Sequence, residues 1–192
     1  MSRWRLFVAA ALTEPIRTAL AEAIGQLRVL APCVSPSQVD AIHLTLHFLG
    51  QVESGRVSQI ADGVGRAIIP FPAFELRVSG VGVFPAPSRP RVLWAGVAGP
   101  GRTELIALQG AMQLALRSAG IELENRVYAP HLTLGRVRRE PRARERASLA
   151  EWMHRWQDVQ FGALPIDAIS LMRSELSVRP PRYTRLESFP LQ

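Results

Sequence analysis

The tetrapeptide His-Leu-Thr-Leu occurs twice in the chain, beginning at His43 and at His131. If each copy lies in a β-strand, alternate side chains share a face, so each histidine projects beside its threonine, Thr45 or Thr133. One histidine can be neutral and the other protonated near neutral pH, because the usual pKa of the side chain is about 6.5. Two copies facing one another would supply a general base, a general acid and two hydroxyl groups. That set suits displacement at a phosphodiester, which needs proton transfer and donors for the non-bridging oxygens.

The repetition points to function more strongly than either histidine does alone. A single histidine in an apolar strand is more often a packed residue than a catalyst, and duplication could copy a structural histidine. Most of the surrounding sequence differs between the two copies, however, whereas the histidine, the threonine and both leucines are shared. We therefore interpret His43 and His131 as catalytic candidates, with Thr45 and Thr133 as candidates for substrate binding.

Other polar residues near the two copies receive different interpretations. Arg136 follows His131 by five residues, at the predicted end of the same strand. A guanidinium group binds phosphate oxygens through paired, charge-assisted hydrogen bonds, so we predict that Arg136 binds the phosphate. His47 would share the face of His43 in a regular strand, and we give it a peripheral role. His154, in a predicted helix, is interpreted as a structural or surface residue.

The composition is that of a globular domain with a strong positive charge. All 23 basic side chains are arginine, because the sequence has no lysine, and 16 acidic residues leave a formal net charge of +7. This charge favours a polyanionic partner, although arginine bias also follows from genome composition. The single Cys33 excludes an internal disulfide framework and a multi-cysteine zinc site, so we expect a cytoplasmic protein.

Apolar runs in the sequence are short. None approaches the roughly 20 residues that a membrane-spanning helix needs. The apolar stretch from Leu6 to Leu12 follows Arg3 and Arg5 and imitates a signal peptide, but it is only 7 residues long. We interpret it as a first strand and expect a monomer with no membrane association.

Hydrophobic periodicity predicts helices and strands in alternation. The predicted helices are one of about fifteen residues from Pro15, one over 57–68, one over 102–119 and one around 149–156. The predicted strands cover 6–12, 41–49, 74–84 and 91–94, a segment through His131, and segments around 166–171 and 183–189. Residues 31–36 are predicted to be a break, and residues 85–90 a proline-rich turn.

The second half of the chain repeats the order of the first. The two tetrapeptides lie 88 residues apart (131 − 43), close to half of the chain, and the arginine-proline turn at 89–91 is echoed at 179–182. We therefore predict a single bilobal catalytic domain over 1–192, with an internal repeat whose halves are approximately 1–98 and 99–192. The predicted fold class is α+β, with two pseudo-two-fold related lobes of mostly antiparallel sheet around a central cleft and helices on the outer faces.

The residues around both histidines resemble the two-histidine phosphoesterase superfamily, and within it the RNA 2′,3′-cyclic phosphodiesterases, historically called 2′-5′ RNA ligases. The segment HLTLHFLG at 43–50 is similar to the first motif of that family, and PHLTLGR at 130–136 to the second. Segments 90–94 and 183–191 are also similar, so the resemblance covers nearly the whole chain. Ala41-Ile42 stand where the family often has an asparagine or similar residue before the histidine.

The resemblance implies a bilobal fold and hydrolysis of RNA-terminal 2′,3′-cyclic phosphates to 2′-phosphomonoesters, without a metal or other cofactor. It also implies that His131 activates the water and that His43 protonates the leaving 3′ oxygen. Thr45, Thr133 and Arg136 would hold the phosphate. The expected partners are RNA ends or nucleotides that carry a 2′,3′-cyclic phosphate.

Other functions remain open at this point. Joining of RNA through a 2′-5′ linkage uses the same transition state, with a ribose hydroxyl in place of water. Hydrolysis of a small cyclic nucleotide or of a 2′-5′ oligoadenylate would use the same groups. A non-catalytic RNA-binding module could use the arginine-rich run at 136–146, although this run contains two glutamates and the chain lacks the aromatic pattern of an RNA-recognition sheet. A metal hydrolase would need a cluster such as His43, His47 and an acid, and Asp40 is the only aspartate nearby.

Overall fold

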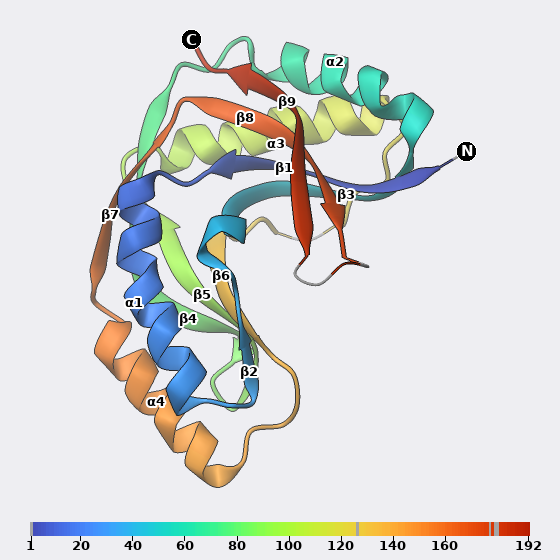
Figure 1. The fold of residues 1–192 in the computed structure, drawn as a ribbon. Coiled ribbons are helices and arrows are strands. Elements are labelled where there is room, and N and C mark those ends of the chain that lie inside the picture. The colour runs from blue at the N-terminus through green and yellow to red at the C-terminus, as the bar shows by residue number, and fades with distance from the viewer. Residues whose placement is uncertain (1, 126, 177, 179–180) are drawn as a thin grey trace.

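Two antiparallel sheets, each covered by a pair of helices, form the two lobes that lie one above the other in Figure 1. The computed structural model describes residues 2–125, 127–176, 178 and 181–192. The first half of the predicted second arginine-proline turn, Arg179 and Pro180, therefore falls outside the described residues. The observed architecture confirms the predicted α+β fold class.

The two sheets contain nine strands in the part of the chain that the structure describes. The β1 sheet has the order β3-β1-β8-β9 and the β6 sheet has the order β2-β6-β5-β4-β7. The strands are β1 (Arg3–Ala11), β2 (Val34–Pro36), β3 (His43–Glu53), β4 (Phe74–Ala86), β5 (Arg89–Ala98), β6 (His131–Val137), β7 (Gln160–Ile166), β8 (Ala168–Glu175) and β9 (Arg182–Pro190). The helices are α1 (Glu14–Leu30), α2 (Val57–Ile68), α3 (Arg102–Ser118) and α4 (Ala143–Trp156), with short 3-10 turns at Val39–Ala41 and Ser54–Arg56.

Helix α1 forms where the sequence predicts it and covers the β6 sheet together with α4. Pro15 stands in its first turn, where the missing N–H costs nothing. Its buried residues recur at helical spacing and include Ile16, Leu20 and Leu27, each 0% exposed. The indole Nε1 of Trp152 in α4 donates to the carbonyl oxygen of Ala23 at 2.9 Å and joins the two helices. None of the described helices is long and apolar enough to cross a bilayer.

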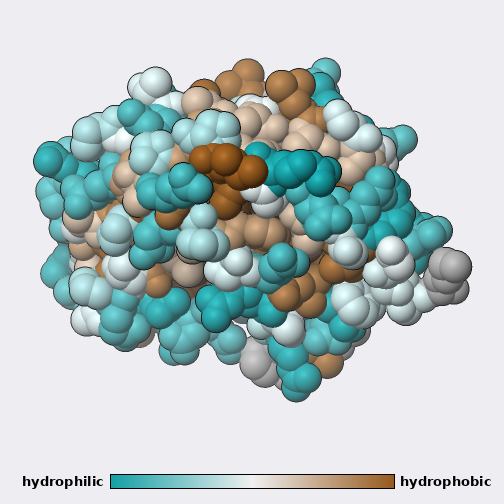
Figure 2. Space-filling model, turned by 90° about the horizontal axis from the view of Figure 1, so that it is seen from above, coloured by the Kyte–Doolittle hydropathy of each residue, from teal (hydrophilic) through white to brown (hydrophobic). Residues whose placement is uncertain are grey.

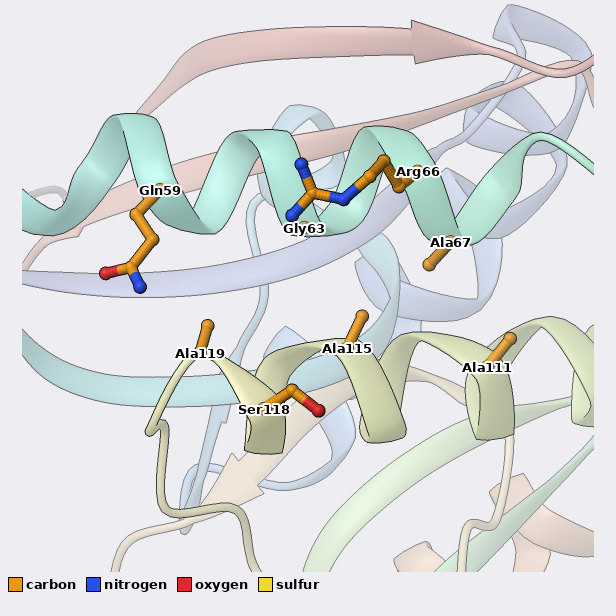
Figure 3. A pocket seen from close by; sticks show the side chains of 8 residues that line it. All are labelled: Gln59, Gly63, Arg66, Ala67, Ala111, Ala115, Ser118 and Ala119. Atoms are coloured by element: carbon orange, nitrogen blue, oxygen red, sulfur yellow. The ribbon is translucent and has the colours of Figure 1, made fainter.

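Helices α2 and α3 lie against one another over the β1 sheet. Small residues line the hollow between them, and Figure 3 shows Ala111 and Ala115 of α3 pointing toward α2, which contributes Gly63 and Ala67. Viewed from the side of α2 and the C-terminus, the surface has patches of hydrophobic side chains among hydrophilic ones (Figure 2). This side of the sheet is covered by helices, so chemistry is expected on the opposite side.

Each sheet takes strands from both halves of the chain. Strands β1 and β3 share a sheet with β8 and β9, whereas β4 and β5 share a sheet with β6 and β7. Helix α1 follows a strand of the β1 sheet but packs on β7 and β2, and α3 follows a strand of the β6 sheet but packs on α2 and β3. In the unit β1-α1-β3 the helix therefore packs in the lobe of the β6 sheet, and in the unit β5-α3-β6 the helix packs in the lobe of the β1 sheet. This reciprocity fits an internal repeat, and the division near residue 98 stays a prediction.

Three local predictions differ from the structure. The predicted break at 31–36 contains β2, because Val34 to Pro36 pair with the far end of β6. The predicted turn at 85–90 is shorter, since β4 continues to Ala86 and β5 begins at Arg89. The single strand predicted around 166–171 is two strands, because β7 ends and β8 begins on either side of Asp167.

Candidate active site

Strand β1 fixes the direction of the side chains in the first tetrapeptide. Residues directly opposite one another in an antiparallel pair share a face, and alternate residues of a regular strand share a face as well. The pairs are Ala11 with His43, Ala9 with Thr45 and Phe7 with Phe48. His43, Thr45 and Phe48 therefore point to the same side of the β1 sheet.

Strand β5 does the same for the second tetrapeptide. The pairs are Gly96 with His131, Trp94 with Thr133 and Val92 with Arg136. His131, Thr133 and Arg136 thus share one face of the β6 sheet, although the arginine lies an odd number of residues after the histidine. The structure therefore brings these three side chains to one side of the β6 sheet, and their role in binding phosphate stays a prediction.

A β-bulge at the same place in each strand explains this arrangement. The pairing skips Leu46 in β3 and Leu134 in β6, and these two leucines are equivalent in the tetrapeptides. A bulge sets two residues against one and reverses the alternation beyond it. In a regular strand Arg136 would turn to the core, so the bulge is what brings its guanidinium to the side of His131.

The bulge also corrects the expectation for His47. The sequence predicts that it shares the face of His43, but that prediction assumes a regular strand and is wrong. His47 is 7% exposed on the helix side, where its Nε2 lies 2.8 Å from the carbonyl oxygen of Gln109 in α3. Burial lowers the pKa of His47. Its counterpart is Gly135, where a Cβ atom would lie 2.8 Å from Cγ1 of Val34, so the short strand β2 requires glycine there.

Aromatic rings enclose His43. The ring of Phe7 stacks on the imidazole at 4.5 Å between centroids, and the ring of Tyr183 in β9 meets it at 5.5 Å and 66°. Burial lowers the pKa of His43 from 6.5 to about 4, while a hydrogen bond to the backbone of Ala41 acts in the opposite direction. The imidazole of His43 is consequently neutral near pH 7 in the unliganded protein.

His131 has a similar but distinct setting. Its Nδ1 lies 2.7 Å from the carbonyl oxygen of Ala129, so both imidazoles are hydrogen bonded to the backbone two residues earlier. The ring of Phe84 meets the imidazole edge-on at 5.1 Å and also lies 5.1 Å from the ring of Trp94. A Cβ atom on Gly82 would lie 2.2 Å from Trp94, so this glycine makes room for the indole.

No role was predicted for these aromatic residues, although Trp94 and Tyr183 lie in segments that resemble the family. Phe7, Phe84 and Trp94 lie in predicted strands far from the histidines in sequence, and only the strand register shows that they share the histidine faces. Tyr183 reaches His43 from the last strand of the same sheet. Every second residue of a regular strand lies on the same face. If this alternation were followed from each histidine onto the partner strands in their correct register, it would find these residues.

The two histidine strands meet where the sheets join. Strands β3 and β6 are in contact, and two side-chain hydrogen bonds link the segments around them. Thr45 and Thr133 are half-buried and their hydroxyl groups make no hydrogen bond to another described residue. Arg136 is exposed and has no carboxylate partner in the described part of the chain. These three side chains can therefore turn toward an anion.

Two arginines of the run after Arg136 form ion pairs with acidic residues nearby in the chain. Arg139 makes two bonds to the carboxylate of Glu145, of 2.6 and 2.8 Å, and Arg146 pairs with Glu140 at 2.7 Å. The bonds from Arg139 and from the backbone of Arg142 hold the pKa of Glu145 at about 2. The positive charge of this run is thus partly neutralised within the protein.

Metal coordination finds little support in the described side chains. Within residues 2–125, 127–176, 178 and 181–192, no group of three or more His, Cys, Asp or Glu residues is arranged to hold a metal ion. The cluster of His43, His47 and an acid that a metal hydrolase would need does not form, because the first two point to opposite sides of β3.

Known proteins share this sequence and fold over nearly the full length. The profile of the 2′-5′ RNA ligase superfamily matches residues 16–177. A Methanothermobacter thermautotrophicus protein named RNA 2′,3′-cyclic phosphodiesterase is 35% identical over 187 residues, which are 97% of this chain and 98% of that protein. The crystal structure of TT0787 of Thermus thermophilus matches with a TM-score of 0.79 and 29% identity over 97% of each chain. That of E. coli LigT complexed with 3′-AMP matches with a TM-score of 0.76 and 26% identity, over 100% of this chain and 99% of LigT. The chain therefore belongs to the 2′-5′ RNA ligase superfamily.

Proposed function

We propose that the protein hydrolyses 2′,3′-cyclic phosphates at RNA ends to 2′-phosphomonoesters, with His43 and His131 as the acid and base. The observation that carries the proposal is the pair of equivalent β-bulges, which set a histidine and a threonine on one face of each sheet and add Arg136 to the second set. Relatives named RNA 2′,3′-cyclic phosphodiesterase, including one 35% identical, support the same substrate class.

The reaction assigns a task to each of these side chains. The oxygen of a water molecule attacks the phosphorus, and the bond from phosphorus to the 3′ oxygen breaks. His131 takes the proton from the water, and His43 gives a proton to the departing 3′ oxygen. Thr45, Thr133 and Arg136 donate hydrogen bonds to the non-bridging oxygens, whose charge grows in the transition state. No step requires a metal ion or another cofactor.

The acidic role of His43 requires a proton that the unliganded protein does not hold near pH 7, because the pKa of the buried imidazole is about 4. The substrate can change that, since it carries a negative charge. A unit charge about 4 Å away stabilises the imidazolium by about 4 kcal/mol at an effective dielectric constant of about 20. A stabilisation of this size would raise the pKa of His43 from its unliganded value toward neutral pH. In this scheme the phosphodiester itself prepares the acid that cleaves it.

The aromatic surroundings favour a nucleotide over a simple phosphodiester. Phe84 and Trp94 lie on the face of His131, and Tyr183 lies beside His43. Flat aromatic side chains bind nucleobases by stacking, at about 1–3 kcal/mol for each base. LigT, which shares the fold, has been crystallised with 3′-AMP, a nucleotide with a phosphate on the same sugar edge.

Identification of the product tests the proposal and separates it from its alternatives. The purified protein is incubated with an oligoribonucleotide that ends in a 2′,3′-cyclic phosphate, with and without EDTA, and the new end is identified by ³¹P NMR. We expect a 2′-phosphomonoester at equal rates in both samples. A longer RNA would support ligation, loss of turnover in EDTA that a divalent ion restores would support a metal hydrolase, and an unchanged end would contradict the proposal.

A further inference from the structure

Two hydroxyl groups cross between the segments that carry the histidines. The phenol oxygen of Tyr128 donates to the backbone carbonyl oxygen of Thr45 at 3.0 Å, and Oγ of Ser37 donates to that of Thr133 at 2.8 Å. Both acceptors are the threonines of the repeated tetrapeptides. Each donor comes from the segment that leads into the other tetrapeptide, because Ser37 lies six residues before His43 and Tyr128 three residues before the second histidine. The two bonds are thus reciprocal.

Both acceptor carbonyl groups, of Thr45 and Thr133, lie where backbone pairing between strands ends. Strand β3 is the edge of the β1 sheet, so Thr45 has a strand partner on one side only. On the β2 side of β6, the pairing ends with Pro36 opposite Gly135, before Thr133 is reached. A half-buried carbonyl group needs a donor, and in both places a side-chain hydroxyl provides it. Burial raises the pKa of Tyr128, which keeps the phenol protonated as a donor.

The bond from Tyr128 joins strands that no sheet joins, because this residue leads into β6 and its acceptor lies in β3. The bond from Ser37 extends the pairing of β2 with β6 and holds the segment that leads into β3 against β6. Strands β3 and β6 belong to different sheets and touch without backbone pairing among the described residues. The position of one tetrapeptide relative to the other therefore depends on side-chain packing and on polar contacts across the junction. The two hydroxyl bonds act on the residue two places after each histidine, which is close enough to move the imidazole with it.

We propose that Ser37 and Tyr128 are positioning residues, which together hold His43 and His131 at the separation and orientation that simultaneous proton transfer needs. This inference rests on the proposed two-histidine function. Acid and base must act on the same phosphorus in one step, and a displacement of about 1 Å can cost about 100-fold in rate. Loosening the junction should therefore lower kcat while leaving substrate binding nearly intact.

The test uses steady-state kinetics of the full-length protein on a nucleoside 2′,3′-cyclic monophosphate. We expect Tyr128→Phe and Ser37→Ala each to lower kcat by about 10-fold, and the double variant by about 100-fold, with KM changed less than about 2-fold. Ser37→Thr retains a hydroxyl and should recover most of the lost kcat. The matched control is Ser174→Ala, which removes a serine hydroxyl bond of 3.5 Å to the carbonyl of Arg5, outside both tetrapeptides, and should leave kcat unchanged.

The outcomes separate the two proposals. If the wild-type protein turns over the substrate and loses activity in His43→Ala and His131→Ala, but Tyr128→Phe and Ser37→Ala keep wild-type kcat, the positioning role is wrong and the two-histidine function stands. An effect confined to KM, or an equal loss of kcat in Ser37→Thr and Ser37→Ala, would also overturn the positioning role. If the wild-type protein shows no histidine-dependent turnover, the proposed function fails first. Thermal melting of each variant confirms that the compared proteins are folded.

Discussion

Tyr183 should help to keep the imidazole of His43 neutral. Its ring lies 5.5 Å from the imidazole, and together with the stacked ring of Phe7 it separates His43 from water. We predict that Tyr183→Ala raises the pKa of His43. Tyr183 is half-buried whereas Phe7 is 2% exposed, so the change opens the site to water at less cost to the core than removal of Phe7 would.

The magnitude follows from the size of the pKa shift. The pKa of His43 is lowered from 6.5 to about 4, and this net shift corresponds to about 3 kcal/mol against the imidazolium. The phenylalanine still covers one face of the ring when the tyrosine is removed. Recovery should therefore be partial, and we expect the pKa of His43 to rise above about 4 but to stay below the usual 6.5.

The assay is an NMR titration of the imidazole Cε1–H resonances, with His43→Gln used to assign the signal among the four histidines. Tyr183→Phe is the matched control, because it keeps the ring and should keep the pKa of His43 near 4. Aromatic rings also attract cations, at about 0.5–2 kcal/mol, which would favour the imidazolium. A fall of the pKa of His43 in Tyr183→Ala would mean that this attraction outweighs desolvation and would refute the reasoning, as would a wild-type pKa near 6.5.

Three further predictions concern stability and RNA binding. The pKa of His43 is lower in the folded than in the unfolded protein, so the unfolded chain takes up the proton first as the pH falls. The free energy of unfolding should therefore fall by up to about 3 kcal/mol from pH 6.5 to pH 4. Urea unfolding should show a smaller fall in His43→Gln. Gly82→Ala sets a methyl group against the indole ring of Trp94 and should lower the free energy of unfolding by about 1–3 kcal/mol in thermal melting. The Cβ atom of Gly110→Ala in α3 meets nothing within 4 Å, so this control should be neutral or stabilising. Arg138→Ala should lower the log–log salt slope of oligonucleotide binding by slightly under one unit. Arg139→Ala should leave the slope unchanged but lower the melting temperature, because Arg139 is paired with a carboxylate and Arg138 has no such partner among the described residues. Equal salt slopes in the two variants would contradict this difference.

Periodicity was enough to predict most of the elements that carry the site. The apolar residues of α1 and α2 keep a strict helical spacing, and the alternation in the first tetrapeptide continues far enough to predict β3. The three-residue strand β2 was missed because it is too short to show alternation, ends on Pro36 and follows Pro32 closely. Its strand conformation depends on pairing with β6, a contact between residues about 100 positions apart in the sequence.

The site was predicted in part for the same reason. Identical tetrapeptides made the two histidines and two threonines visible, and the structure sets each pair on one face of its strand. The bulge was not visible, because Leu46 and Leu134 look like ordinary inward residues of a regular strand. The bond of Tyr128 depends on how the lobes dock and that of Ser37 on the pairing of β2 with β6, and no local pattern encodes either contact. The monomeric state and the cytoplasmic location stay predictions.

The most direct test of the central proposal compares His43→Ala and His131→Ala on a nucleoside 2′,3′-cyclic monophosphate. His154→Ala serves as the control, because its imidazole bonds only to Gln157 in α4's C-terminal turn among the described residues. Each histidine should contribute about 10²–10⁴ in rate, so each of the two variants should lose at least about 100-fold in kcat while its circular dichroism spectrum stays that of the folded protein. Because the two act in one step, the double variant should lose little more than the worse single variant. A folded His43→Ala or His131→Ala protein with wild-type kcat would contradict the two-histidine mechanism.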